Sequence, residues 1–222
     1  MTNRHPLIGA LCLALLSGCG SNQPGDVMDY VKALRQSWRN TFNGNSVSLQ
    51  QAAAVPYASM GWRLNGSSEN MIVLATDAGG QQLWTSAAHI VLVTQGGRLV
   101  RTVGLPHDIA ALTPKTASAI LDPAVAIAGP YSQRFAADYQ HKDLYGVVLN
   151  CRAAAAGARL MTILGKKIAT VRVDETCEST APQMKFTNSY WISRDTGLVW
   201  RSRQTISPEG DVLETELLRP PG

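Results

Sequence analysis

The stretch HIVLVTQGGRLVRTVGLPHDI, residues 89–109, predicts a β-hairpin and with it the class of the fold. Residues 90–94 form an apolar run rich in β-branched side chains, and residues 99–103 form a second such run. Between the two runs, Gly96-Gly97 is a dipeptide that readily adopts the positive φ angles of a tight turn. The stretch therefore indicates antiparallel β-structure.

The returning strand of this hairpin carries an arginine on each of its two faces, because side chains alternate along a strand. The two sets are Leu99, Arg101 and Val103, and Arg98, Val100 and Thr102. A buried guanidinium needs a carboxylate or several carbonyl groups around it. We expect a buried ion pair between Arg101 and Asp108, and an arginine at a frayed sheet edge is the equally weighted alternative.

Apolar runs that end at turn signals recur along the rest of the chain. Besides the hairpin, we expect strands at residues 47–55, 58–64, 70–76, 82–85, 143–151, 159–164, 168–176, 184–193, 198–206 and 212–218. Helices are expected at residues 27–40 and, within a crossover at 110–131, at residues 116–121. This pattern predicts a single, mainly β domain, residues 26–222, with an N-terminal helix and a short helical crossover. Its antiparallel meander of about ten strands forms a sandwich or a partly closed barrel.

The N-terminus has the features of an export signal. Arg4 precedes an apolar run at residues 7–16, and Leu16-Ser17-Gly18-Cys19 follows. A basic start, a short apolar run and small residues before the cut are typical of a secretory signal peptide. The four last residues resemble a bacterial lipobox. We therefore expect residues 1–18 to be the signal peptide and residues 19–25 to be a lipidated tether.

The lipobox resemblance implies a covalent diacylglyceryl and acyl lipid on Cys19, and we expect no other cofactor. Several acyl chains at one residue give stable membrane anchoring. In lipoproteins with this motif, a residue other than aspartate after the cysteine permits export to the outer membrane. Gly20 thus implies a lipid anchor in the outer membrane, with the domain in the periplasm.

The charge of the chain excludes a nucleic-acid partner. The formal charge is +4, and removal of residues 1–18 takes away only Arg4, which leaves +3. Such a charge, without a basic run longer than Lys166-Lys167, does not make an electrostatic surface for nucleic acid.

Two cysteines remain in the mature domain once Cys12 and Cys19 are assigned to the signal and the lipid. We expect Cys151 and Cys177 to form a disulfide in an oxidising compartment. A metal site is the alternative, but no histidine lies near either cysteine in the sequence.

The sequence shows no catalytic motif, and we expect neither catalytic residues nor a metal site. It contains no HExxH spacing, no Gly-x-Ser-x-Gly nucleophile elbow and no glycine-rich phosphate loop. His107 and Asp108 are the residues that would line a cleft if the protein were an enzyme. The favoured interpretation is that the histidines are surface loop residues.

The segment Trp200-Arg201-Ser202-Arg203 is a candidate interface. Trp200 and Ser202 lie opposite Arg201 and Arg203 on one strand, so the arginines form an exposed basic ridge that suits an acidic glycan or a protein partner. The five tryptophans could stack on sugar rings, but filling the core of the β domain is their more common role.

Two motif blocks resemble one protein family. The first is Val93-Thr94 with residues 97–102, Gly104-Leu105 and Asp108-Ile109, and the second runs from Tyr190-Trp191-Ile192-Ser193 to Arg219-Pro220. With the lipobox and the cysteine pair, they are similar to the group 4 capsule polysaccharide lipoproteins of the YjbF/GfcB type. Residues 110–130 and the alanine run 153–156 match no family pattern.

The resemblance implies an antiparallel β lipoprotein at the outer membrane, acting as a non-enzymatic accessory or scaffold in capsule or exopolysaccharide assembly or export. The implied partners are outer-membrane lipid, an outer-membrane barrel protein, a periplasmic protein and the polysaccharide. A direct glycan-binding module, a polysaccharide-modifying enzyme and a carrier with a hydrophobic half-barrel are the alternatives.

Overall fold

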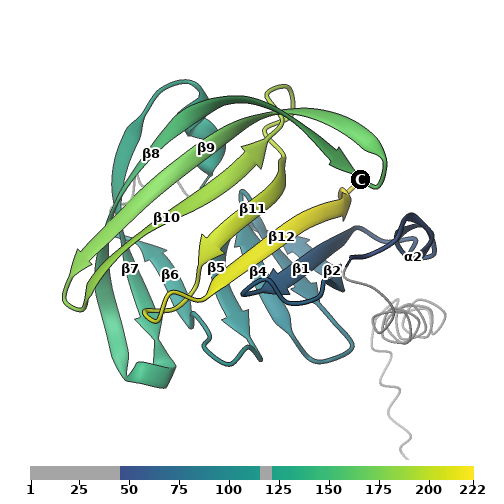
Figure 1. Ribbon diagram of the computed structural model, residues 1–222. Coiled ribbons are helices and arrows are strands. Elements are labelled where there is room, and N and C mark those ends of the chain that lie inside the picture. Colours follow the sequence, from purple (N-terminus) through teal and green to yellow (C-terminus); the bar gives the residue numbers. More distant parts are fainter. Residues whose placement is uncertain (1–45, 116–121) are drawn as a thin grey trace, which may run out of the picture.

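The computed structural model describes residues 46–115 and 122–222 (Figure 1). Within these residues, twelve strands form one antiparallel sheet that curls into a nearly closed barrel. The strands are β1 (Ser59–Leu64), β2 (Asn70–Ala78), β3 (Gln81–Thr85), β4 (Val91–Gln95), β5 (Arg98–Val103), β6 (Ala111–Pro114), β7 (Tyr131–Tyr139), β8 (Leu144–Ile163), β9 (Lys166–Thr180), β10 (Gln183–Ile192), β11 (Val199–Thr205) and β12 (Val212–Arg219). The predicted mainly β fold is confirmed, as a barrel and not a sandwich.

The order of strands in the sheet is β5-β4-β3-β2-β1-β12-β11-β10-β9-β8-β7-β6. The first and last strands of the domain meet in the middle, where β1 pairs with β12, and the two edges are β5 and β6. These edges belong to consecutive strands of the chain, and the Thr102 N–H of β5 donates to the Ile109 carbonyl at 2.9 Å. The curled sheet thus brings its two edges close together.

The predicted first strand at residues 47–55 is wrong, because this segment contains the helix α2 (Leu49–Ala53). Ser48 Oγ accepts from the Gln51 N–H, while Gln51 Oε1 accepts from the Ser48 N–H at 2.7 Å. This reciprocal capping box satisfies two amides at the start of the helix, and the alanines that follow favour helical structure. Local capping chemistry therefore decides the structure of this segment.

Strand β8 is longer than predicted, because the expected strands at residues 143–151 and 159–164 are one continuous element. The alanine run 153–156 lies within it, and a bulge interrupts its pairing with β9 between Ala155 and Ala158. The long β8–β9 hairpin curves over the barrel toward the C-terminus (Figure 1).

Several predicted segments fall outside the described residues. They are the signal peptide at 1–18, the tether at 19–25, and the helices at 27–40 and 116–121. The described part of the crossover contains one 3₁₀ helix, η1 (Pro123–Ile127), and a second, η2 (Gln140–Lys142), lies between β7 and β8. Among the described residues, no helix has the length and the apolar character needed to cross a membrane.

The core of the barrel is built from the inward side chains of alternating strand positions. Near β1–β5 and β12 the cluster is large and apolar, and it includes Trp84, Leu92 and Leu213, each at most 2% exposed. Near β7–β10 a second cluster surrounds Phe135 and the two cysteines. Polar side chains lie at the level where these clusters meet, and they form the interior part of the site described next.

Candidate functional site

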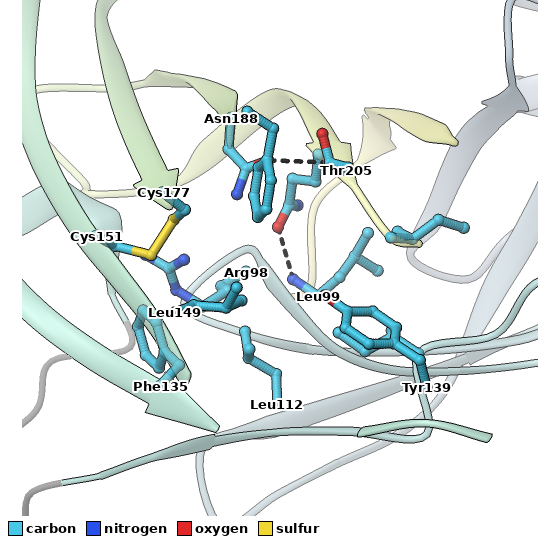
Figure 2. Close-up of a pocket in the computed structure, with 14 residues that line it drawn as sticks. Arg98, Leu99, Leu112, Phe135, Tyr139, Leu149, Cys151, Cys177, Asn188 and Thr205 are labelled. Carbon is cyan, nitrogen blue, oxygen red and sulfur yellow. Dashed lines mark hydrogen bonds between the residues drawn. A yellow bond between two sulfur atoms is a disulfide. The ribbon is translucent and has the colours of Figure 1, made fainter. Parts of the chain in front are cut away.

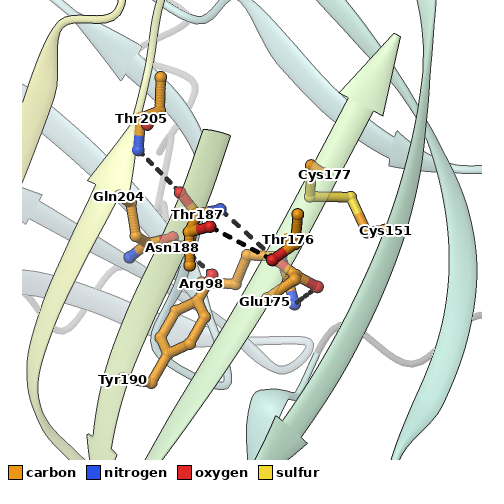
Figure 3. Close-up of a disulfide and its surroundings, with 10 residues drawn as sticks. All are labelled: Arg98, Cys151, Glu175, Thr176, Cys177, Thr187, Asn188, Tyr190, Gln204 and Thr205. Atoms are coloured by element: carbon orange, nitrogen blue, oxygen red, sulfur yellow. Dashed lines mark hydrogen bonds and ion pairs between the residues drawn. A yellow bond between two sulfur atoms is a disulfide. The ribbon is translucent and has the colours of Figure 1, made fainter. Parts of the chain in front are cut away.

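A buried ion pair crosses the interior of the barrel. The Arg98 guanidinium of β5 donates to both oxygens of Glu175 on β9, with Nη1–Oε2 and Nη2–Oε1 distances of 2.6 and 2.8 Å (Figure 3). The arginine is 1% exposed and the glutamate 0%. A bidentate pair of this kind fixes direction as well as distance.

Aromatic rings and amide side chains enclose this pair. The Arg98 guanidinium carbon lies 4.8 Å from the centre of the Phe135 ring and 5.5 Å from that of Tyr190. Burial alone would lower the pKa of Arg98, but the facing Glu175 carboxylate outweighs this and raises the pKa. Burial also raises the pKa of Tyr190, so its hydroxyl stays protonated.

Gln204 links the hairpin turn to this interior. Its Oε1 accepts from the Leu99 N–H at 2.9 Å and from the Tyr190 hydroxyl at 3.2 Å. Its Nε2 donates to the Gly97 carbonyl at 3.0 Å. One amide therefore binds the backbone on both sides of Arg98 and the hydroxyl of Tyr190, which explains why this polar residue is buried.

The space beside the ion pair is almost completely filled. The pocket there holds about 20 Å³ and is bounded by side chains such as Leu112, Phe135 and Leu149 (Figure 2). This volume suits about one water molecule. It does not accommodate a sugar ring or an acyl chain.

The predicted buried ion pair between Arg101 and Asp108 is wrong. Arg101 is exposed, because the arginine on the inward face of β5 is Arg98. Asp108 accepts from the Thr102 hydroxyl at 2.7 Å and from two loop amides, those of Gly104 and Leu105. Its carboxylate therefore holds the loop after β5 and does not line an arginine site.

Glu175 was not identified from the sequence, although a signal for it exists. It lies at an inward position between Val173 and Cys177, which are 0% and 2% exposed. An acidic residue in register with buried apolar neighbours requires a buried cation. This pattern identifies Glu175 as a buried carboxylate. It does not identify the arginine that pairs with it, which is 77 residues away.

The predicted disulfide is confirmed. Cys151 of β8 and Cys177 of β9 lie directly opposite in the antiparallel ladder and are bonded through their sulfurs (Figure 3). Cys177 is two residues from Glu175 on the same inward face, so the disulfide fixes the strand pair that presents the carboxylate.

The predicted basic ridge exists on the outer face, but acidic residues accompany it. Arg201 lies opposite Glu216 of β12 and donates to its carboxylate through Nε at 2.8 Å. Arg203 lies opposite Glu214, with a nitrogen–oxygen distance of 3.6 Å. The outer face is thus a ladder of paired charges, in which both arginine side chains remain partly exposed.

The tryptophan on the same face as the arginines is Trp191, whereas Trp200 lies on the opposite face, as the alternation of side chains along β11 predicts. Trp191 of β10 lies opposite Arg201 in the ladder, and the Arg172 guanidinium carbon is 5.6 Å from its ring centre. Trp200 instead packs against the core and lines a cleft of about 430 Å³ between α2 and the tip of the β8–β9 hairpin.

His107, the other candidate from the sequence, lies in the loop after β5. Its Nδ1 is 2.6 Å from Asp211 Oδ2 in the β11–β12 turn. The side chain is 39% exposed. The contact with Asp211 joins residues 104 positions apart, so no local pattern in the sequence predicts it.

Comparison with known proteins identifies relatives along nearly the whole chain. The model of the family "Group 4 capsule polysaccharide lipoprotein gfcB, YjbF" matches residues 31–218. The lipoprotein GfcB of Escherichia coli K12 is 26% identical over 221 residues, which cover 97% of this chain and 99% of that protein. YjbF of the same organism is 27% identical over 220 residues, covering 97% and 98%. Both relatives are described as uncharacterized lipoproteins.

A solved lipoprotein structure shares the fold of the chain. The crystal structure of the hypothetical lipoprotein YmcC from Escherichia coli K12 superposes with a TM-score of 0.72 at 26% identity. The match covers 91% of this chain and 100% of that one. Together with the sequence match over most of the chain, this shows that the chain belongs to the group 4 capsule polysaccharide lipoprotein family of GfcB and YjbF.

Proposed function

We propose that this protein is an outer-membrane lipoprotein that acts as a non-enzymatic scaffold in the assembly or export of a capsule or exopolysaccharide. Family membership supports a role related to capsule and attachment to a membrane. The lipobox that ends at Cys19 supports a lipid anchor at that residue, and Gly20 supports the outer membrane with the domain in the periplasm.

The close packing around the buried ion pair is the observation that carries the scaffold role. Sites for small molecules usually offer several hundred cubic ångströms. The pocket beside the Arg98–Glu175 pair holds about 20 Å³. Larger clefts of about 430 and 460 Å³ lie at the rim near α2 and on the outer surface beside β5 and β6. Contacts at the surface therefore suit this domain better than a carrier role inside the barrel.

The proposed partners are an outer-membrane barrel protein and a periplasmic protein of the export system, with outer-membrane lipid around the anchor. The parts of the β5 and β6 edges that are not joined to each other support a protein partner, because an edge strand can pair with a strand of another chain. A detergent pull-down of the acylated protein from its native envelope identifies such partners by mass spectrometry.

Deletion of the gene tests the scaffold role directly. We expect the deletion strain to secrete less polymer, and expression of the wild-type chain to restore secretion. The variant Cys19→Ala should fail to restore it, whereas Cys12→Ala should restore it fully, because Cys12 is removed with the proposed signal peptide. Unaltered polymer secretion in the deletion strain contradicts the proposal.

Direct glycan binding at the outer face is a second candidate function, and one observation favours it. Trp191 offers an aromatic ring flanked by Arg172 and Arg201, a combination that suits an acidic sugar. Titration with purified polymer fragments should quench tryptophan fluorescence in the wild type and in Trp200→Ala, but not in Trp191→Ala. Absence of saturable binding at millimolar saccharide dismisses this candidate.

A further inference from the structure

Three loops that are far apart in the sequence bring two histidines and a glutamate together at one end of the barrel. His107 follows β5, His141 lies in η2 between β7 and β8, and Glu209 lies in the β11–β12 turn. One ligand atom from each lies within 4.8 Å of the others. Imidazole and carboxylate groups together are a donor set that zinc and similar divalent ions prefer.

We propose that His107, His141 and Glu209 form a binding site for one divalent transition-metal ion of the zinc class. The expectation from the sequence was that no metal site exists, because no two of these residues share a motif. The fold brings the three side chains together although they are far apart in the sequence. The proposal does not depend on the role in polysaccharide export.

The orientation of His107 is the strongest support for the site. Its Nδ1 is 2.6 Å from Asp211 Oδ2, and that carboxylate also accepts from the Ser207 hydroxyl at 2.6 Å. Its other oxygen accepts from the Asn65 amide at 2.6 Å. A carboxylate that holds one ring nitrogen fixes the tautomer and leaves the other nitrogen as a ligand, which is the usual arrangement around a metal-bound histidine. We assign Nε2 of His107 as its ligand atom.

The other two ligands already point toward each other. His141 Nε2 is 3.0 Å from Glu209 Oε2. The imidazole rings of His107 and His141 are stacked, with centroids 4.6 Å apart. Four-coordinate zinc at bond lengths of about 2.0–2.2 Å places neighbouring ligand atoms about 3.4 Å apart. Rotation of these partly exposed side chains is therefore enough to bring the three ligand atoms to bonding distance from one ion. The fourth coordination position stays open to water.

Lys142 is the group that competes with the metal. Its Nζ is 2.8 Å from Glu209 Oε1, and its side chain is 51% exposed. A bound cation would displace this ammonium into solvent. Removal of Lys142 should therefore strengthen metal binding. If the three residues formed only a network of surface ion pairs, removal of Lys142 would not change metal binding.

Zinc titration of the full-length acylated protein in detergent, after chelator treatment, tests the proposal. Calorimetry should show one equivalent bound, and His141→Ala and Glu209→Gln should each weaken binding by roughly 10-fold or more. Lys142→Ala should strengthen it. Cobalt substitution should give a visible absorption band that disappears in His141→Ala, which reports ligation directly.

His89→Asn is the matched control, because His89 is exposed at a positive φ of 61° that asparagine also adopts. It should bind zinc as the wild type does. Circular dichroism shows whether each variant is folded. The proposal is overturned if no saturable binding occurs up to 100-fold excess zinc, or if folded His141→Ala and Glu209→Gln bind as the wild type does.

Discussion

Arg98 and Glu175 are 77 residues apart in the sequence, yet they form two hydrogen bonds of 2.6 and 2.8 Å in the centre of the barrel. The pair joins β5, at one edge of the sheet, to β9, which lies eight places away in the strand order. It therefore links opposite walls of the barrel across the interior. A contact of this kind depends on closure of the sheet, so it reports on the tertiary fold and not on any local element.

Replacement of Arg98 by methionine should destabilise the domain by about 3–5 kcal/mol, because it leaves the Glu175 carboxylate buried and without its cation. The double variant Arg98→Met/Glu175→Leu should recover much of that loss, since it removes both charges. Urea denaturation measures both free energies of unfolding.

Arg101→Met is the matched control for this experiment, because it makes the same substitution three positions along the strand at an exposed site. It should change the free energy of unfolding by less than about 0.5 kcal/mol. If the two methionine variants were equally stable, the buried pair would have no part in holding the barrel closed.

These residues also show what can be predicted from sequence. Strand periodicity correctly placed an arginine on the buried face of β5, and the turn dipeptide correctly placed the hairpin. The identity of that arginine depends on which face the rest of the sheet covers, and its carboxylate comes from a strand that no local pattern connects to β5. Sequence reasoning chose Asp108 because it lies nearby in the chain, which was wrong.

The same limit applies to the other differences. The capping box at Ser48 and Gln51 is a local signal that indicates a helix in the segment predicted as the first strand. The position of Trp191 beside Arg201 arises from the pairing of β10 with β11. The contact of His107 with Asp211 joins residues that are 104 positions apart. Contacts that depend on closure of the barrel were missed, whereas the cysteine pair was found by elimination.

Reduction of the Cys151–Cys177 disulfide should lower the free energy of unfolding by about 3–4 kcal/mol, because the bond closes a loop of 26 residues. Guanidinium titrations with and without reductant measure the difference. The double variant Cys151→Ala/Cys177→Ala should be insensitive to reductant. Identical unfolding midpoints for the oxidised and reduced wild type would contradict the prediction.

Gly97→Ala should destabilise the domain more than Gly80→Ala does. Both glycines have positive φ, 81° and 78°, so each alanine carries a similar backbone penalty of about 1 kcal/mol. At Gly97 a Cβ would also lie 2.5 Å from the Val199 side chain of β11, whereas at Gly80 the nearest atom is 4.0 Å away. Overpacking of this kind adds about 1–3 kcal/mol.

Thermal unfolding of the two glycine variants checks this difference. The Gly80 variant serves as the control for backbone strain, so the remaining loss in Gly97→Ala reports the close approach of the hairpin turn to β11. Equal melting temperatures would mean that the turn is not packed against Val199.

Ionisation of Glu69 should lower the stability of the domain as the pH rises, whereas ionisation of most carboxylates in folded proteins raises it. The Glu69 carboxylate packs against the Cα of Gly61. It accepts from the Val47 N–H at 2.6 Å and is 3.4 Å from the Arg63 guanidinium. Burial raises the pKa of Glu69 above its usual 4.5 in spite of these partners. Its contribution to stability is therefore fully present below about pH 4.5 and is lost as the pH rises through the folded-state pKa.

Comparison of the wild type with Glu69→Gln at several pH values isolates this effect, because glutamine keeps the shape and cannot ionise. Between pH 4 and pH 7, the free energy of unfolding of the wild type should fall relative to that of the variant. Glu178→Gln is the control, since Glu178 is 61% exposed at its side chain. The reverse trend, with the wild type gaining on Glu69→Gln as the pH rises, would show that the hydrogen bond from Val47 and the charge of Arg63 outweigh burial at this carboxylate.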